Sequence, residues 1–268
     1  MPVAISGIGR RGALIEAGEA PMPYGLYISA EGAQAQVARM EVIANNLANV
    51  DTPGFKRDLA LIQARYAEAI EQGLEAPQSG SIDDVGGGVL VAETLTDFSS
   101  GALKNTGIPS DLAIDGDGFF AVERDGEMLL TRAGNFQISP TGELLTQDGL
   151  SVLDDSGTPI VVSGTWRVGQ DGQISDEAGA TTLGLFRPES LGDLVKIGEN
   201  LFRSLSDPQP VPPAQRRVVQ NFLEGSGVQP TTEMMELIAT QRAFEANTQL
   251  IKNQDDMLDS LISRLLKG

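Results

Sequence analysis

Apolar residues recur with the same spacing near both ends of the chain. Near the N-terminus they alternate steps of four and three residues, at Leu26, Ala30, Ala33, Val37, Met40, Ala44 and Leu47. Near the C-terminus they stand seven residues apart, at Leu237, Phe244, Ile251, Leu258 and Leu265. A repeat of about 3.5 residues is typical of the seam of a coiled coil. The pattern predicts two long helices, over about 26–49 and from just after Pro230 to about 266.

Turn-forming residues end the first predicted helix. Three asparagines, Asn45, Asn46 and Asn49, come just before Pro53 and Gly54, which favour a tight turn. The apolar residues of the next stretch predict a short amphipathic helix, at Leu59, Ile62, Tyr66 and Ile70. A glycine-rich stretch over 78–88 then predicts a flexible loop.

The second predicted helix has polar features at its start and beside its seam. Thr231 or Thr232 is placed to cap it, and Glu233 suits its first turn. Asn247 and Gln254 lie beside the apolar stripe, where polar groups can fix the register at some cost in stability.

The middle of the chain, from about Val89 to Asn221, predicts an antiparallel β domain. Short apolar runs are separated by dipeptides that supply the positive φ of hairpin turns. These are Asp125-Gly126, Thr141-Gly142, Asp148-Gly149 and Asp171-Gly172. A proline-rich connector follows at 206–217. The fold class expected is α+β, with terminal helices that form a coiled coil and a central, mainly β domain.

The chain therefore divides into five predicted segments. They are a tail at 1–22, an assembly helix with its turn at 23–58, a short helix and loop at 59–88, the β domain at 89–221 and a second assembly helix at 222–268. Met22 stands just before the first stripe, so translation starting there would leave the tail out.

Composition narrows the classes of function. The formal charge of −18, from 37 acidic and 19 basic residues, argues against nucleic acid and anionic lipid as main partners. The chain has no Cys and no His, which excludes disulfides, imidazole ligands and Ser-His or Cys-His catalysis. No run approaches the ~18 apolar residues of a membrane span. No apolar stretch follows Arg10 and Arg11, so a cleaved signal peptide is not expected.

Acidic motifs offer only weak candidates for chemistry. The run Asp115-Gly116-Asp117-Gly118 lacks the alternating ligands and closing Glu of a calcium loop. Carboxylate pairs such as Asp115 with Asp117 could in principle serve acid–base hydrolysis, but such pairs arise by chance among 37 acids. The sequence predicts no catalytic, cofactor or metal site, and no small-molecule substrate.

Three segments carry a family resemblance. "MEVIANNLANVDTPGFKRD" resembles the N-terminal signature of the bacterial flagellar rod and hook proteins, and "LEGSGVQPTTEMMELIATQRAFEANTQLIKNQDDMLDSLI" is similar to their C-terminal signature. "DLAIDGDGFFAVERDGEMLLTRAGNFQISPTGELLTQDG" is similar to their shared β domain. The resemblance covers nearly everything from Met22 onward, and the tail before it departs from the family pattern.

The resemblance implies a structural subunit of the flagellar basal-body rod. Paired terminal helices would pack as the inner shell of a hollow shaft that transmits motor torque, with the β domain facing outward. Such proteins leave through the flagellar export apparatus without a cleaved signal and form the rod across the periplasm. The implied partners are other rod and hook subunits and copies of the same chain. The residues expected at assembly contacts are Leu26, Ala33, Val37, Met40, Asn45, Asn46, Leu47, Asn49, Gly54, Phe55, Leu237, Gln241, Arg242, Phe244, Glu245, Asn247, Ile251 and Leu258.

Several alternatives stay open at this level. The run "NFLEGSGVQPTTEMMELI" favours a proximal rod subunit, while "TQRAFEAN" suits a distal subunit equally well. The two helices could also pack only on each other or on the β domain within one chain. Other function classes are a β-domain binding module that its helices oligomerise, and an acid–base hydrolase acting on the cell wall.

Overall fold

The computed structural model describes residues 24–64, 66, 70, 86–177 and 179–266. The tail predicted over 1–22 and most of the loop predicted over 78–88 lie outside these residues. Two compact units are present. Unit 1 comprises the described residues within Met1–Gln34, Ala64–Val89 and Glu245–Gly268, and unit 2 those within Ala35–Gln63 and Leu90–Phe244.

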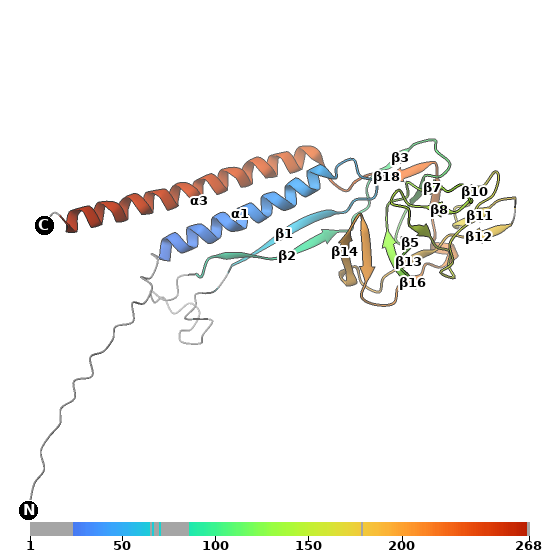
Figure 1. Cartoon of the computed structure of the whole chain (residues 1–268), viewed down its shortest axis with the longest axis horizontal. Helices are drawn as coiled ribbons and strands as arrows, with labels where there is room; N and C mark the ends of the chain where they lie inside the picture. Colours follow the sequence, from blue (N-terminus) through green and yellow to red (C-terminus); the bar gives the residue numbers. More distant parts are fainter. Residues whose placement is uncertain (1–23, 65, 67–69, 71–85, 178, 267–268) are drawn as a thin grey trace, which may run out of the picture. The chain divides into compact units, whose positions relative to one another are not determined.

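Two long helices occupy the positions that the apolar spacing predicts. Helix α1 spans Tyr24–Ala48 and helix α3 spans Pro230–Leu265 (Figure 1). The cap predicted at Thr231 or Thr232 is wrong, because α3 already begins at Pro230. Proline suits a first helical position, where its fixed φ is helical and its missing N–H is not needed. The carbonyl of Gln229 accepts a hydrogen bond from the Glu233 N–H at 3.1 Å.

A strand stands where the sequence predicts the start of a short helix. Strand β1, Arg57–Ala64, pairs with β2, Val89–Asp97, in a two-stranded sheet. The apolar residues of this stretch fit a period of two almost as well as a period of 3.6, so the local pattern is ambiguous. Pairing with β2, which is rich in Val and Thr, supplies the backbone hydrogen bonds that a short isolated helix would hold only weakly.

The β body of unit 2 consists of short strands, and its described pairings are antiparallel. The strands that precede residue 160 are β3 Leu103–Asn105, β4 Leu112–Ile114, β5 Phe119–Arg124, β6 Glu127–Thr131, β7 Gln137–Ile138, β8 Leu144–Leu145 and β9 Ser151–Val152. The later strands are β10 Arg167–Val168, β11 Gln173–Ser175, β12 Ala180–Thr182, β13 Leu185–Arg187, β14 Leu194–Gly198, β15 Leu201–Ser204, β16 Gln209–Pro210, β17 Val218–Gln220 and β18 Phe222–Glu224. Two 3₁₀ turns, Leu191–Asp193 and Pro213–Gln215, interrupt the second half.

Strand β5 is the centre of the largest sheet. The sheet has the order β14-β15-β6-β5-β9-β8-β7, and β5 also pairs with β13, which in turn pairs with β16. Side chains of β5 alternate between two buried clusters: Phe120 and Val122 join one cluster, whereas Phe119 and Ala121 join the other. Because β5 is buried on both faces, it reads as a continuous apolar run rather than an alternating one.

The four predicted hairpin dipeptides are confirmed as turns. Asp125 and Gly126 have φ of 54° and 81° and connect β5 to β6, as a two-residue turn with two positive φ angles requires. The glycines of the other three dipeptides also have positive φ, at Gly142, Gly149 and Gly172. Local turn chemistry therefore determined the pairing of these strands.

The C-terminal boundary of the β body lies later than predicted. Strand β18, Phe222–Glu224, pairs with β3, and β17 pairs with β4. The segment predicted as an assembly helix from residue 222 therefore starts with a strand, and its helix begins at Pro230. The proline-rich connector at 206–217 contains β16 and the second 3₁₀ turn.

Candidate functional site

The turn after α1 docks onto the β body of unit 2. The Gly54 N–H donates to the Glu224 carbonyl at 2.8 Å, and the Gly227 N–H donates to the Phe55 carbonyl at 2.9 Å. Asn200 Nδ2 donates to the Pro53 carbonyl at 2.8 Å. We call this turn, residues 49–57, together with the side chains that hold it, the joint.

Gly54 is required at its position in the joint. Its φ is +67°, which side-chain-bearing residues adopt at a cost. A Cβ placed there would lie 2.4 Å from the carbonyl carbon and oxygen of Arg132 and 2.7 Å from the Ala133 nitrogen. Because these are backbone atoms, they cannot move aside as a flexible side chain could. The glycine therefore serves both the turn and the close approach of two backbones.

A buried ion cluster closes the joint from inside. Lys56 Nζ donates to Glu224 Oε1 at 2.7 Å, and Arg132 Nη1 donates to Glu224 Oε2 at 3.2 Å. The side chains of Lys56 and Glu224 are each 1% exposed. Lys56 also donates to the Ser99 carbonyl at 2.8 Å, and Arg132 Nη2 donates to the Gly116 carbonyl at 2.7 Å. One carboxylate from β18 thus holds two cations from segments far apart in the sequence.

Burial dominates the electrostatics of this cluster. It lowers the pKa of Lys56 below its ordinary value, although the hydrogen bond and the charge of Glu224 oppose the effect. Burial also lowers the pKa of Arg132, again against the charge of Glu224. Removing the carboxylate would leave both cations buried without their counter-charge, which is costly.

A second ionic cluster joins the start of β1 to the first turns of α3. Arg57 Nε lies 2.5 Å from Glu233 Oε1, and Arg57 Nη2 lies 3.0 Å from Glu236 Oε1. Asn46 Nδ2 lies 3.4 Å from Glu233 Oε2. Burial by itself would lower the pKa of Arg57, but the charges and hydrogen bonds of Glu233 and Glu236 outweigh it and raise the pKa.

Asn46 and Lys196 both bind Asp58, which follows the turn of the joint. Asn46 Nδ2 donates to the Asp58 carbonyl at 2.8 Å, and Asn46 Oδ1 accepts from the Asp58 N–H at 2.9 Å. Lys196 Nζ donates to Asp58 Oδ2 at 2.8 Å and lies 4.0 Å from the centroid of the Phe55 ring. The side chain of Asn46 thus binds the backbone of β1 as another strand would.

Contacts between α1 and α3 run in opposite chain directions. Gly25 lies beside Gln254, and a Cβ at Gly25 would be 2.8 Å from Gln254 Nε2. Gly32 lies beside Asn247, with 3.1 Å between a Cβ there and Asn247 Nδ2. From Gly25 to Gly32 the contact moves seven residues forward along α1, and from Gln254 to Asn247 it moves seven residues back along α3. The polar residues predicted beside the seam therefore face glycines of α1.

Only part of each predicted apolar stripe is covered in the single chain. On α1, Ala33 is buried and the half-buried stripe residues are Leu26, Met40 and Leu47, whereas Ala30, Val37 and Ala44 are exposed. On α3, the half-buried stripe residues are Leu237, Phe244, Ile251 and Leu258, and Leu265 is exposed. Of the two alternating positions in the α1 stripe, the one that includes Ala33 is covered and the one that includes Val37 is exposed.

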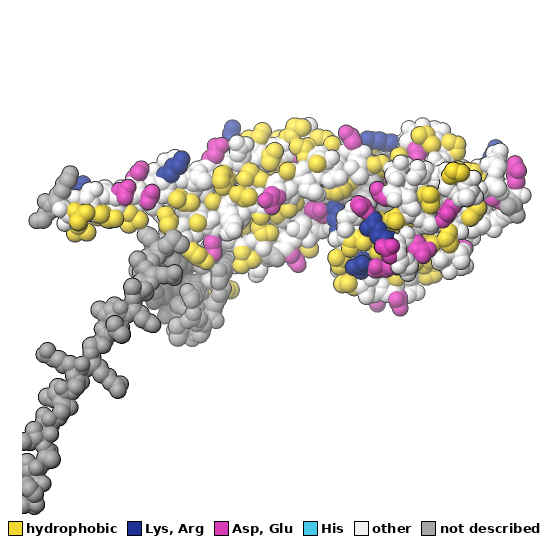
Figure 2. Space-filling model, viewed as in Figure 1, with side chains coloured by type: hydrophobic (Ala, Val, Ile, Leu, Met, Phe, Trp, Pro, Cys, Tyr) yellow, Lys and Arg dark blue, Asp and Glu magenta, His cyan; other side chains and the backbone are white. Residues whose placement is uncertain are grey.

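Further apolar side chains are exposed along α3. They are Met234, Met235, Ile238, Leu250, Met257, Leu261, Ile262, Leu265 and Leu266. Figure 2 shows hydrophobic side chains distributed along both helices. Large exposed apolar surface is typical of sites that bind other proteins. Among the described residues, neither helix is long and apolar enough to cross a membrane.

The predicted assembly residues differ in how far the single chain buries them. Asn46, Gly54 and Phe55 are buried within the joint of their own chain, so the structure gives them a contact inside the subunit. The exposed group comprises Val37, Asn45, Gln241, Arg242 and Glu245. The half-buried Asn49 lines a groove beside the turn, and the half-buried Asn247 faces α1.

Sequence reasoning missed most of the charges that hold the joint. Arg132, Lys196 and Glu224 carry no local signal, because their partners lie far along the chain. Lys56 belongs to the signature turn, yet its burial could not be read from a basic pair. Glu233 was expected to suit a helix start, whereas it is 1% exposed and bound to Arg57.

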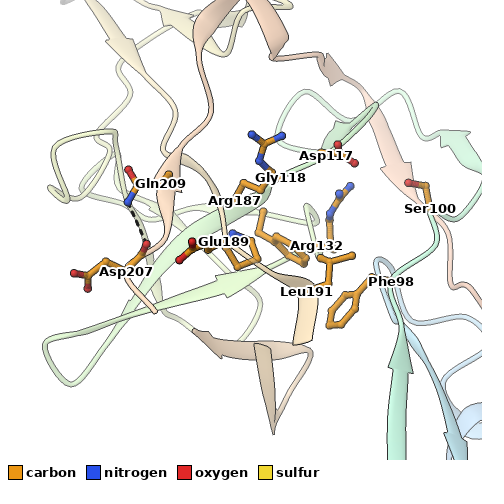
Figure 3. Close-up of a pocket in the computed structure, with 12 residues that line it drawn as sticks. Phe98, Ser100, Asp117, Gly118, Arg132, Arg187, Glu189, Leu191, Asp207 and Gln209 are labelled. Carbon is orange, nitrogen blue, oxygen red and sulfur yellow. Dashed lines mark hydrogen bonds between the residues drawn. The ribbon is translucent and has the colours of Figure 1, made fainter. Parts of the chain in front are cut away.

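A cavity of about 690 Å³ opens beside the joint in unit 2. Figure 3 shows Phe98 and Leu191 near Arg132, with Asp117, Arg187 and Glu189 around them. Asp117, one of the acids considered for hydrolysis, thus lies by a cation that Glu224 already binds. Among the described residues, no group of three acidic side chains could hold a metal ion.

Family models match three parts of the chain. "Flagella basal body rod protein" matches residues 26–56, "Flagellar hook protein FlgE/F/G D1 domain" matches residues 113–176, and "Flagellar basal body rod FlgEFG protein C-terminal" matches residues 219–264. The first and third include the two sides of the joint, with Lys56 in one and Glu224 in the other.

Curated relatives match over most of their length. The flagellar basal-body rod protein FlgF of Caulobacter vibrioides is 33% identical over 252 residues, covering 92% of this chain and 99% of the relative. The flagellar basal-body rod protein FlgG of Bacillus subtilis is 33% identical over 257 residues, covering 89% and 97%. The FlgG protein of Agrobacterium fabrum is 34% identical over 262 residues, covering 90% and 99%. This chain therefore belongs to the family of flagellar basal-body rod proteins.

Proposed function

We propose that this protein is a structural subunit of the flagellar basal-body rod that polymerises through its terminal helices. The observation that carries the proposal is the exposed apolar surface along α1 and α3, such as Val37, Ile238 and Leu250. A single chain leaves this surface in water, and contact with neighbouring copies would bury it. Repeated contacts of one kind that do not close into a ring build a helical shaft.

Within the subunit, the proposal takes α1 and α3 as a coiled coil. The sevenfold stripe from Leu237 to Leu258 supports it, as does the matched sevenfold spacing of Gly25 and Gly32 against α3. Helical pairs of this kind would line the hollow shaft, and the β body would face outward. The shaft would transmit the torque of the motor, so no catalytic step is assigned.

We assign the subunit to the proximal rod. The support is the run over 221–238, which resembles the proximal type and contains Glu224 and Glu233 of the joint. The relatives named FlgF and FlgG are nearly equal in identity, at 32–34%, so overall identity does not select the type. A distal rod or hook-type subunit is the alternative within the family.

The proposal includes export and location. The subunit would leave the cytoplasm through the flagellar export apparatus without a cleaved signal and join other rod and hook subunits across the periplasm. The absence of a helix that could span a membrane, within the described residues, is compatible with this route.

Deleting the gene and imaging the remaining basal bodies tests the proposal. We expect the shaft to stop at the proximal rod and motility to be lost, with both restored by the wild-type gene. A full-length rod in the deletion strain would contradict the proposal. Periplasmic targeting that is independent of the flagellar apparatus would favour the alternative of a β-domain binding module.

Phe244→Asp tests the helical seam directly. Because Phe244 belongs to the sevenfold stripe of α3, a charge there would be buried without a partner in the assembled seam. We expect the variant to be exported with a folded β body but to fail to build the rod. Arg167→Asp, on the exposed start of β10, is the control for an added carboxylate. Normal assembly of Phe244→Asp would contradict a role of this residue in the seam.

A further inference from the structure

Three short segments of unit 2 meet at the edge of the β body. They are the turn of the joint, the stretch between β2 and β3, and the stretch between β18 and α3, at residues 49–57, 98–102 and 225–229. The first leads from α1 to β1, and the other two are the chain connections into and out of the strands β3–β18. We call the three segments the crossing. How the crossing is held decides how firmly the β body is joined to the helical residues of unit 2.

Glu224, the last residue of β18, binds the crossing to the β body. Its Oε1 accepts from Lys56 Nζ at 2.7 Å and from the Gly101 N–H at 2.9 Å. Its carbonyl accepts from the Gly54 N–H at 2.8 Å. Its Oε2 accepts from Arg132 Nη1 at 3.2 Å, and Arg132 follows β6 of the body. One residue therefore ties two of the segments to the third and all of them to the body.

The crossing has little apolar packing of its own. The two hydrophobic clusters of the β body consist of buried residues between Leu112 and Val218. Among the described residues of the crossing, only Phe98 packs against either cluster, although Phe55 and Val228 are also buried. Segments that make few buried apolar contacts open more readily than the core to which they attach. The β body should therefore keep its core when the crossing opens.

Charge makes a partial opening of the crossing costly. The side chains of Lys56 and Glu224 are each 1% exposed, and that of Arg132 is 5% exposed. If Glu224 withdraws, both cations lose their counter-charge in the interior, and only exposure to water relieves that cost. We therefore expect the three segments to separate together rather than one at a time.

We infer that Glu224 is a releasable lock on the crossing. When its bonds to the two cations and to Gly101 break, the crossing opens as one unit while the β body stays folded. Asn200 and Lys196, which bind carbonyls of the same turn, release it in the same step. The closed state fixes residues 49–57 and the start of α3 to the β body, and the open state frees them. The inference does not depend on the proposed rod function, because the lock lies within one chain.

Hydrogen exchange of the wild-type full chain tests the lock without any substitution. The amides of Gly54, Gly101 and Gly227 report on the crossing, and those of Ala121 and Leu153 report on the β body. After correction for intrinsic rates, we expect the crossing amides to exchange about 100-fold faster than the body amides. Their exchange should also depend less on urea, because opening the crossing exposes less surface than unfolding the body. Equal exchange of the two groups at every urea concentration would overturn the inference.

Acetylation of Lys56 by N-hydroxysuccinimidyl acetate measures the open state directly. The Lys56 side chain is 1% exposed, so the reagent reaches it only when the crossing opens, and the exposed Lys252 on α3 gives the reference rate. In Glu224→Gln, Lys56 should react about 100-fold faster relative to Lys252, because the lock has lost its charge. The body amides should stay protected. Glu189→Gln, which changes an exposed carboxylate, is the matched control and should leave the Lys56 rate unchanged.

The two measurements together separate a lock from a general contribution to stability. Fast acetylation of Lys56 in Glu224→Gln with protected amides at Ala121 and Leu153 supports the lock. Fast acetylation with equal loss of protection in the β body would mean that the crossing and the body unfold together, and the inference fails. An unchanged Lys56 rate in Glu224→Gln would show that the carboxylate does not hold the crossing closed, and it would refute the lock as well.

Discussion

The contacts that hold the joint in unit 2 differ in kind from the contacts between the two helices in unit 1. In the joint, Lys56, Arg132 and Glu224 are buried and paired, and Gly54 touches backbone. In unit 1, the contacts around Gly25 and Gly32 involve the flexible ends of amide side chains.

This difference indicates where the subunit tolerates amino-acid substitutions. A closed ionic cluster fails when one member is removed, because the others stay buried without a partner. A contact between glycine and a long amide side chain adjusts by rotation of that side chain. We therefore expect mutations to act strongly in the joint and weakly at the helical contacts of unit 1.

The largest effect is expected for Glu224→Gln. The variant keeps the size of the side chain but leaves Lys56 and Arg132 buried without a counter-charge, which should cost about 3–5 kcal/mol of unfolding free energy. Urea unfolding followed by tryptophan fluorescence would measure it, because Trp166 is buried in the main core. Glu189→Gln, at the edge of the cavity that Arg132 also lines, is the control and should change little. A loss below about 1 kcal/mol would show that the cluster is not held by charge.

Gly54→Ala is expected to have the next largest effect. Its Cβ would collide with the backbone of Arg132 at a positive φ, which should cost about 2–4 kcal/mol in strain and displacement. Gly107→Ala is the matched control, because Gly107 has a φ of +71° but no atom within 4 Å of an added Cβ. The control should lose only about 1 kcal/mol. Equal losses in the two variants would mean that the close approach to Arg132 does not matter.

Asp97 should give the joint a modest dependence on acid. The Ser99 N–H donates to Asp97 Oδ1 at 2.9 Å, and this hydrogen bond, with Lys56 and Arg57 nearby, lowers the pKa of Asp97 below 3.8. A lowered pKa of an acid stabilises the folded state above the unfolded value, and the gain is lost as the pH falls through the folded value.

Asp97→Asn isolates this charge because it keeps an acceptor for the Ser99 N–H. The variant should be less stable than the wild type by only about 0.5 kcal/mol at about pH 6, because solvent screens a charge that is only partly buried. The gap should close as the pH falls below 3.8. Urea midpoints across this range would measure it, and a gap independent of pH would contradict the assignment.

The smallest effect, and of opposite sign, is expected for Gly32→Ala in unit 1. Replacing a helical glycine with alanine should stabilise α1 by about 0.5–1 kcal/mol. The nearest atom to the new Cβ is Asn247 Nδ2, the end of a side chain that can rotate away. Hydrogen exchange of the α1 amides would detect slower opening. Faster exchange would mean that α1 and α3 need glycine for close packing, as Gly54 is needed in the joint.

Local patterns were sufficient for the regular elements. The apolar spacing predicted α1 and α3 to within two residues at most ends, and the Asp-Gly dipeptides predicted turns such as Asp125-Gly126. Local patterns failed at β1, where the spacing of Leu59 and Ile62 suits one face of a helix although both residues lie in a strand. The segment forms a strand because it pairs with β2, and β2 is too far along the chain to enter a local sequence pattern.

The joint could not be predicted because its partners are distant in sequence. Lys56 and Glu224 are 168 residues apart, and Asn46 and Glu233 are 187 apart. Nothing in a local window distinguishes a glutamate that binds a buried lysine from one that faces solvent. The family resemblance identified the segments that contain Asn46, Lys56 and Glu224. It did not indicate that these three side chains are buried.

The sequence by itself determined that this is an α+β chain of the flagellar rod family, with long helices at both ends. Helix periodicity and turn chemistry act over a few residues, so both can be recognised in the sequence alone. Only the tertiary structure decided which signature residues are buried within the subunit, such as Asn46, and which are exposed, such as Asn45. The physical reason is burial: a charge or an amide enters the interior only where a distant segment supplies its partner.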